Sequence, residues 1–265
     1  MSLNKPILII LFFLCSARFV QAQEATWEIG LAGGAAGYMG DLNQNNPLQI
    51  SGISAGIFAK RNFNPYLGLR LQYNYAQIQA KDANSNNEQF RERNLSFKTP
   101  LNEGSLIFDF NFFDYKINGG SRRFSPYLFA GVGFVQFKPR VKYNGETYRL
   151  DRLATEGQPE AYKNTVLTIP YGVGLRYNYK DAWSIFTEIG YRTPLTDYID
   201  DVSGVYPVNQ VIVGNPPNQL NLTDPSLHQT GFAGTQRGDF RKRDTYLFVS
   251  VGISFTFVSS KCYSF

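Results

Sequence analysis

Few side chains in this sequence could carry out catalysis or bind a metal. The one histidine, His228, stands two residues from Ser226, and this spacing alone does not give the geometry of an acyl-transfer triad. Asp197, Asp200 and Asp201 offer carboxylates to Ca²⁺, but they lack the glycine and the spacing of a known calcium loop, so we interpret them as solvated surface charge. The sequence contains no phosphate-binding glycine loop and no zinc-ligand set. We therefore expect a protein that is not an enzyme and uses no metal or cofactor.

A second group of charged residues lies within segments in which polar and apolar side chains alternate: Glu28, Arg70, Asp109, Arg176 and Glu188. In each segment the charge falls on the face opposite the large apolar side chains. Charges of both signs in a narrow interior of low dielectric must pair with one another. A proton or ion route is the alternative, but the interior of a small barrel is filled by its own side chains. We expect these residues to form a structural charge network inside a barrel.

The elements that would position these charges are strands, because the alternation has a period of two. It predicts eight strands, at 27–38, 51–59, 67–75, 103–115, 127–137, 166–179, 183–192 and 245–257. In most of them large aliphatic and aromatic residues form one face, and small, polar or charged residues form the other. A soluble β-sandwich, the competing fold, would bury its large side chains and expose its charges. A barrel in lipid has the opposite arrangement.

The connections between the predicted strands alternate in length. Short turns follow the second, fourth and sixth strands, and longer loops follow the others, the longest after residue 192. Outer-membrane barrels are built with short periplasmic turns and long external loops. The composition agrees, since aromatic residues make up 15% of the chain and such barrels carry aromatic girdles. We predict an all-β fold, an eight-stranded antiparallel up-and-down transmembrane β-barrel with long external loops, in contact with outer-membrane lipid.

The first residues predict export. Lys5 precedes an apolar stretch at 6–14, and Ala22 ends a short segment that a signal peptidase would cleave, which leaves Gln23 as the mature N-terminus. Cys15 follows a leucine rather than the small residue that lipoprotein signals need, so we do not expect a lipid anchor there. The predicted organisation is a signal peptide at 1–22, a barrel at 23–258 and a periplasmic tail at 259–265. Loss of the signal lowers the formal charge from +5 to +3, which gives no reason to expect nucleic-acid binding.

The last strand and the tail carry two further features. The spacing of Ser250, Gly252, Phe255 and Phe257 is typical of the terminal signal that the outer-membrane assembly machinery reads, although any alternating aromatic strand offers it. Cys262 is the one cysteine left in the mature chain, and it would lie in the oxidising periplasm. We interpret it as a tolerated thiol or as a contact with a periplasmic partner.

The last loop begins with an acidic segment, Asp197-Tyr-Ile-Asp-Asp-Val-Ser203, and ends with a basic one, Arg237-Gly-Asp-Phe-Arg-Lys-Arg-Asp244. Because the strands on either side of this loop pair, the two segments should be adjacent. We expect Asp200 or Asp201 to pair with Arg237 or Arg243 and so to clamp the base of the loop.

Together with Lys261-Cys262 after the final strand, these two segments resemble a Bacteroidetes barrel family, the PorG-like outer-membrane component of the type IX secretion system. The resemblance covers essentially the mature chain. The residues that match the family-like loop motifs are Asp197, Tyr198, Asp200, Asp201, Arg237, Gly238, Arg243 and Asp244. The resemblance implies a non-enzymatic barrel that associates with periplasmic lipoprotein and ring subunits of a secretion complex. The alternative is an OmpX- or OmpA-like structural or adhesive barrel that acts through its surface loops.

Overall fold

The computed structural model describes residues 26–117, 120–226, 228–239 and 241–257. The predicted signal peptide at 1–22 and the predicted tail at 259–265 with Cys262 lie outside the described residues.

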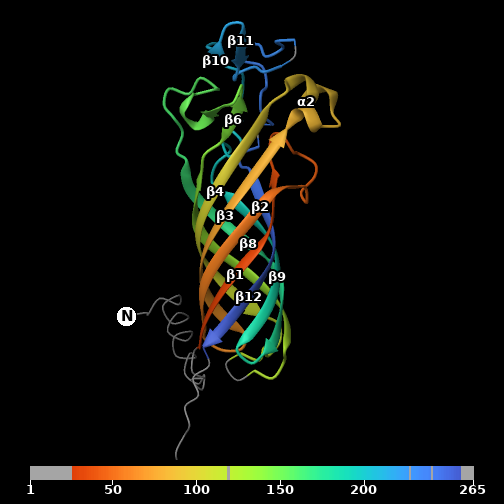
Figure 1. Cartoon of the computed structure of the whole chain (residues 1–265), viewed down its shortest axis with the longest axis vertical. Helices are drawn as coiled ribbons and strands as arrows, with labels where there is room; N and C mark the ends of the chain where they lie inside the picture. The colour runs from red at the N-terminus through yellow and green to blue at the C-terminus, as the bar shows by residue number, and fades with distance from the viewer. Residues whose placement is uncertain (1–25, 118–119, 227, 240, 258–265) are drawn as a thin grey trace, which may run out of the picture.

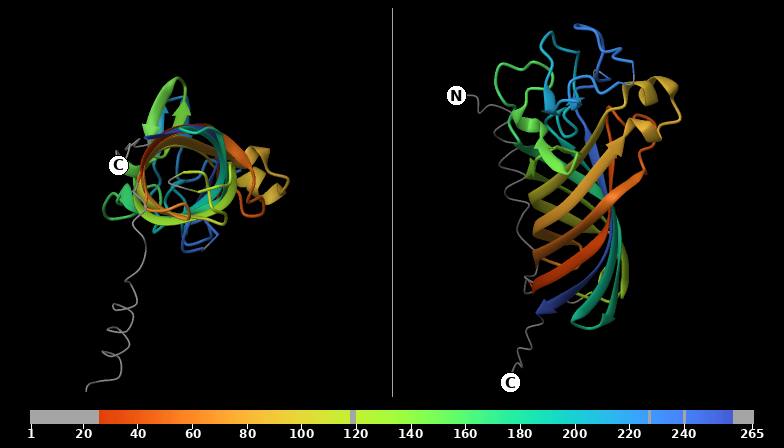
Figure 2. Two further views of the ribbon diagram at one scale, coloured as in Figure 1. Left: turned by 90° about the horizontal axis from the view of Figure 1, so that it is seen from below. Right: turned by 45° about the horizontal axis from the view of Figure 1, so that its top comes forward.

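Long antiparallel strands form a closed barrel, with each strand paired to the next along the chain (Figure 1). The barrel strands are β1 (Thr26–Met39), β2 (Ile50–Asn62), β3 (Leu67–Lys81), β4 (Ser96–Asn111), β5 (Phe124–Phe137), β8 (Thr165–Lys180), β9 (Trp183–Pro194) and β12 (Thr245–Phe257). The last strand, β12, pairs with β1, and the ring is visible when the molecule is viewed along its axis (Figure 2, left). Closure pairs both edges of every one of these described strands, as a chain in lipid requires. The predicted fold class is confirmed.

The outer face of the barrel carries a belt of exposed large apolar side chains. Leu31, Ile57, Leu71 and Phe134 are each more than half exposed, on strands around the ring. Trp27 and Trp183 stand at the end of the belt near the short turns, where interfacial aromatic residues are expected. Monomeric soluble proteins rarely expose a contiguous apolar surface that runs around the whole molecule. The belt therefore contacts lipid.

The external loops hold small elements that the sequence did not predict. They form two hairpins, β6 (Arg140–Tyr143) with β7 (Glu146–Arg149) and β10 (Ile212–Asn215) with β11 (Asn218–Asn221), and one short helix, α2 (Glu88–Arg93), with the 3₁₀ turns η1 (Asp82–Asn84) and η2 (Leu150–Arg152). Those labelled in Figure 1, β6, β10, β11 and α2, lie at one end of the barrel, where β6 pairs with β4. These elements are too short for a hydrophobic period to reveal them. None of the helices in the described ranges has the length and hydropathy that a membrane-crossing helix needs.

Two strands extend further toward the external loops than the alternation predicted. β3 continues past Tyr75 to Lys81, and β4 begins at Ser96 rather than at Glu103. In these extensions the pattern inverts, because Ile78 and Phe97 point inward and are buried while Lys98 is exposed. The barrel thus rises out of the lipid, where water surrounds its outer face and an apolar core fills its interior. The predicted strand at 103–115 also ends earlier, at Asn111.

Candidate functional site at the capped mouth of the barrel

The interior of the barrel at the level of the belt contains the charged residues that the alternation placed there. Arg70 is central: its Nη1 lies 2.5 Å from Glu188 Oε1 and its Nη2 lies 3.1 Å from Asp109 Oδ1. Arg176 Nη2 lies 3.4 Å from the other oxygen of Asp109. Glu28 is connected to this network by Lys60, a cation that the sequence analysis did not identify.

Lys60 Nζ lies 2.9 Å from Asp109 Oδ2 and 3.9 Å from Glu28 Oε2. The predicted strand stopped one residue before it, whereas β2 runs on to Asn62. The alternation itself could have found this lysine, because Lys60 continues the inward face of β2 that already includes Ser54 and Phe58.

Aromatic rings close the remaining space around these charges. The Arg176 guanidinium lies 4.0 Å from the centre of the Tyr127 ring, and that of Arg70 lies 5.3 Å from the centre of the Phe58 ring. The cavity left among these groups measures only about 10 Å³, the space of one water molecule. The described interior is therefore a packed network rather than a pore.

Toward the external end, the last loop folds into the barrel mouth and forms what we call the cap, residues 196–206. Ile199 and Val202 of the cap are almost completely buried in an apolar cluster with Leu101 and Phe137 of the barrel wall. The hydroxyl of Thr99 donates a hydrogen bond to the carbonyl of Ile199 at 2.7 Å. This part of the last loop therefore plugs the external mouth of the barrel.

The two family-like segments of the last loop meet at the cap. The backbone N–H groups of Arg237 and Gly238 both donate to the carbonyl of Gly204, at 2.8 and 2.9 Å. The N–H of Ile199 donates to Asp244 Oδ2 at 3.1 Å, and the N–H of Asp244 donates to the carbonyl of Thr196 at 3.2 Å. Segments that stand far apart in the loop sequence therefore form one packed unit.

The predicted clamp, an ion pair of Asp200 or Asp201 with Arg237 or Arg243, is wrong in its partners. Arg237 Nη1 lies 2.9 Å from Glu156 Oε1, in another loop, and donates to the carbonyl rather than the carboxylate of Asp201 at 2.8 Å. Arg243 is exposed and makes no ion pair with any described residue. Its charge is turned to solvent because the neighbouring Asp244 points inward.

The sequence analysis interpreted Asp200 and Asp201 as solvated surface charge, and the structure shows that this interpretation is wrong. Asp200 and Asp201 are 2% and 1% exposed, because the cap carries them into the barrel mouth. Asp200 accepts a hydrogen bond from the Tyr38 hydroxyl, and Asp201 accepts one from Tyr162 at 2.6 Å. Burial raises the pKa of Asp201 to about 6, although Arg237 acts in the opposite direction. Tyr198 stacks on Tyr162, with ring centres 4.5 Å apart.

Beside the cap, three aspartates from two loops come together. Carboxylate oxygens of Asp41, Asp197 and Asp244 all lie within 4.8 Å of one another. Burial, with the charge of Asp239 and then Asp197 nearby, raises the pKa of Asp41 to about 7. Burial and neighbouring carboxylates also raise the pKa of Asp197, to about 6, and hold that of Asp244 well above its usual range. Asp41 was missed because no local pattern links the first loop to the last.

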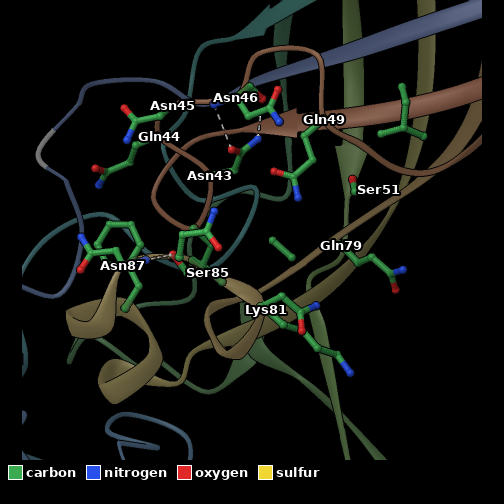
Figure 3. Close-up of a pocket in the computed structure, with 16 residues that line it drawn as sticks. Asn43, Gln44, Asn45, Asn46, Gln49, Ser51, Gln79, Lys81, Ser85 and Asn87 are labelled. Atoms are coloured by element: carbon green, nitrogen blue, oxygen red, sulfur yellow. Dashed lines mark hydrogen bonds between the residues drawn. The ribbon is translucent and has the colours of Figure 1, made fainter.

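A groove between the first two external loops is lined mainly by uncharged polar side chains (Figure 3). Its volume is about 940 Å³, and its walls include Gln44, Asn45, Gln49, Gln79 and Asn86. Asn43 braces one wall by donating to the carbonyls of Tyr38 at 2.6 Å and Asn46 at 2.8 Å. Such amides can hydrogen-bond other polar molecules in both directions.

His228 and Ser226 do not form a catalytic pair. The His228 ring is exposed, and its Nδ1 lies 2.9 Å from Glu92 Oε1. Ser226 Oγ accepts a hydrogen bond from the N–H of Thr230 at 2.8 Å. The residues predicted to form an assembly signal, Ser250, Gly252, Phe255 and Phe257, all lie in β12 at the closing seam. Whether the assembly machinery reads them stays a prediction.

A closed ring of strands, an apolar belt and a polar, packed interior define a bacterial transmembrane β-barrel, and the protein is an outer-membrane barrel of this class. A family model described as "Domain of unknown function (DUF6089)" matches residues 5–224, and the chain belongs to that family.

Solved outer-membrane barrels are similar to this chain at low sequence identity. A major outer membrane protein from Thermus thermophilus is 12% identical, covering 88% of this chain and 100% of that one, with a TM-score of 0.44. The outer membrane protein OprG from Pseudomonas aeruginosa is 10% identical, covering 90% and 100%, with a TM-score of 0.43. A search of curated protein sequences finds none that matches.

Proposed function

We propose that this barrel is an accessory component of the type IX protein secretion machinery that docks periplasmic ring subunits. The observation that carries the proposal is the contact between the two family-like segments. Arg237 and Gly238 bind Gly204 beside the motif aspartates, so the residues on which the resemblance rests act as one structural unit. A shared packed unit supports the family likeness more strongly than two separate short motifs.

The filled interior supports an anchoring role rather than transport through this chain. The ion pairs of Arg70 span the barrel, and the cap closes its mouth. A barrel of this kind can fix a periplasmic assembly to the outer membrane without opening a path of its own. Its cargo would cross elsewhere in the machinery.

The face available to periplasmic subunits is the end of the barrel with the short turns, which we call the periplasmic rim. Exposed Arg122 and Arg123 lie there, beside an ion pair of 2.6 Å between Lys116 Nζ and Asp181 Oδ1. The arginines leave the rim with an excess of positive charge. An acidic surface on a periplasmic lipoprotein or ring subunit would complement it.

A capture experiment tests this proposal. The tagged full-length protein is cross-linked in cells, extracted in detergent and analysed by mass spectrometry. We expect periplasmic ring subunits to be enriched, and Arg122→Glu with Arg123→Glu to reduce that enrichment, whereas Arg91→Glu at the external end does not. Deletion of the gene should also block secretion of type IX cargo. Normal secretion in the deletion strain would contradict the proposal.

Cys262 gives a second test of the same partner contact, since a periplasmic thiol could form a disulfide with a ring subunit. Non-reducing gels of whole membranes, with thiols trapped at lysis, should show a high-mass band that disappears with reductant and in Cys262→Ser. A monomer band under all conditions excludes the disulfide.

The second candidate function is an OmpX- or OmpA-like structural or adhesive barrel that acts through its surface loops. The amide-lined groove between the first two external loops favours it (Figure 3). Whole cells with Gln44→Ala and Gln49→Ala should then lose binding to their surface ligand, while secretion stays normal.

A further inference from the structure

We propose that Asp41, Asp197 and Asp244 form a calcium site that fastens the first external loop to both ends of the last loop. This proposal does not depend on the secretion role. Asp41 follows β1, Asp244 precedes β12 and Asp197 follows β9, and these three strands are neighbours in the barrel because β12 pairs with both β1 and β9. An ion held among them would join these segments at the base of the cap.

The geometry suits a shared ion. Carboxylate oxygens of the three aspartates lie within 4.8 Å of one another. Calcium binds oxygens at 2.3–2.6 Å, so oxygens on opposite sides of one ion are separated by up to about 5 Å. The three carboxylates could therefore bind the same ion with little movement.

Two buried carboxylates of this cluster each leave one oxygen without a partner. Asp41 is 0% exposed, and it accepts a hydrogen bond from the N–H of Asp239, while its Oδ2 has no partner in the part of the chain that the structure describes. Asp244 is 1% exposed, and it accepts from Ile199 at Oδ2 while its Oδ1 has no hydrogen-bond partner among the described residues. Asp197 Oδ1 is also without one. Buried polar atoms without partners are costly, and a bound cation would satisfy all three.

The surroundings supply too little positive charge. Arg93 is the guanidinium that acts on Asp41, but it is bound to Asp82, with Nε 2.6 Å from Oδ2 and Nη2 2.9 Å from Oδ1. Asp239, also beside the cluster, is paired with Arg241 at 3.2 Å, and Asp200 adds a further carboxyl next to the three aspartates. A divalent cation would neutralise this excess.

Two glycines let these carboxylates approach. A Cβ on Gly40 would lie 2.0 Å from Asp244 Oδ1, and a Cβ on Gly238 would lie 2.7 Å from Asp41 Oδ1. Gly238 is one of the family-like motif residues, and the close approach of Asp41 accounts for a glycine there.

Calcium fits this site better than magnesium or zinc. The donors are carboxylate oxygens, which a hard cation prefers, and no described histidine or cysteine belongs to the cluster. Three aspartates on separate loop segments suit the irregular coordination that calcium accepts, whereas magnesium requires near-ideal octahedral geometry. Sites of this kind outside the cell bind at about 10⁻⁴–10⁻³ M.

The test uses the full-length protein in detergent, stripped of metal with a chelator. Titration with CaCl₂ followed by calorimetry should give one bound ion per chain, and MgCl₂ should bind more weakly. Exposed Arg241, Lys242 and Arg243 are trypsin sites within the last loop, next to Asp244. Calcium at ten times its Kd should slow cleavage there about tenfold, because the ion binds the closed loop.

Variants separate the site from general damage to the cap. Asp41→Asn and Asp244→Asn should lose both the heat of calcium binding and the protection. Asp201→Asn is the matched control, a buried aspartate of the same loop outside the cluster, and it should keep both. Heat-modifiable migration in dodecyl sulfate shows that each variant still forms the barrel. If the carboxyls share protons instead, wild-type protein will bind no calcium and Asp244→Asn will be cleaved no faster than wild type, which overturns the proposal.

Discussion

Arg70 and Glu188 form an ion pair across the full width of the barrel, with Nη1 and Oε1 2.5 Å apart. Arg70 belongs to β3 and Glu188 to β9, and these strands stand opposite each other in the ring. Asp109 accepts from the same guanidinium at 3.1 Å, so one arginine links three strands.

Removal of Arg70 should weaken the barrel strongly. Arg70→Met leaves Asp109 and Glu188 buried with too little positive charge, and breaking a buried pair in this way costs about 3–5 kcal/mol. We expect the temperature at which the folded band disappears in dodecyl sulfate to fall markedly. Arg123→Met, an exposed arginine in a turn, is the control and should leave that temperature unchanged. An unchanged temperature for Arg70→Met would show that the network contributes little.

The protein should not form a large channel. The charges and rings at the level of the belt leave a cavity of only about 10 Å³, and the cap closes the external mouth. Purified protein in a planar bilayer is expected to give no steady current of porin size. Regular large conductance steps that persist with fresh, heat-modifiable protein would disprove a packed interior.

Arg237 and Glu156 should be coupled in holding the cap. Glu156 Oε1 accepts from Arg237 Nη1 at 2.9 Å and from the N–H of Ser203 at 3.0 Å. We expect Arg237→Met and Glu156→Gln each to speed proteolysis of the last loop several-fold. The double variant should be less damaged than the sum of the two, because neighbouring charges couple non-additively. The protease is chymotrypsin, which does not cut after arginine, so Arg243→Met can serve as the control. Simple additivity of the two changes would argue against the pair.

The cap should open more readily as the pH rises when no metal is present. Burial raises the pKa of Asp201 from its ordinary value of 3.8 to about 6, against the effect of Arg237. The folded cap therefore binds this proton more tightly than the open one, and its stabilisation is lost as the pH rises through about 6. With chelator present, proteolysis should be slower at about pH 5 than at about pH 7.5, and Asp201→Asn should reduce that difference. A steeper pH dependence in the variant would contradict the assignment.

The sequence was sufficient to predict the part of the barrel that spans the membrane. Every predicted strand exists, and β12 has the predicted bounds, because the contrast between lipid and interior forces a strict alternation. The inward positions of Glu28, Arg70, Asp109, Arg176 and Glu188 follow from the same alternation.

The external site could not be predicted in this way, because its residues are joined by tertiary packing between loops. Asp41 belongs to the first loop and Glu156 to the third, and nothing local connects either with the last loop. The extensions of β3 and β4 above the membrane were also missed. There Ile78 and Phe97 point into the barrel, because water rather than lipid surrounds its outer face, so the alternation is the reverse of that in the belt.

The trans-barrel pair of Arg70 and Glu188 has a consequence for biogenesis. Arg70 lies in β3 and its partner Glu188 in β9, so the pair forms only once both strands have joined the sheet. Until then Arg70, Lys60 and Arg176 outnumber the acidic groups already beside them, Glu28 and Asp109. An unfinished sheet therefore exposes unneutralised charge toward the bilayer. We therefore expect the membrane to favour a nearly completed ring, so that closure of the barrel and entry into the membrane are coupled.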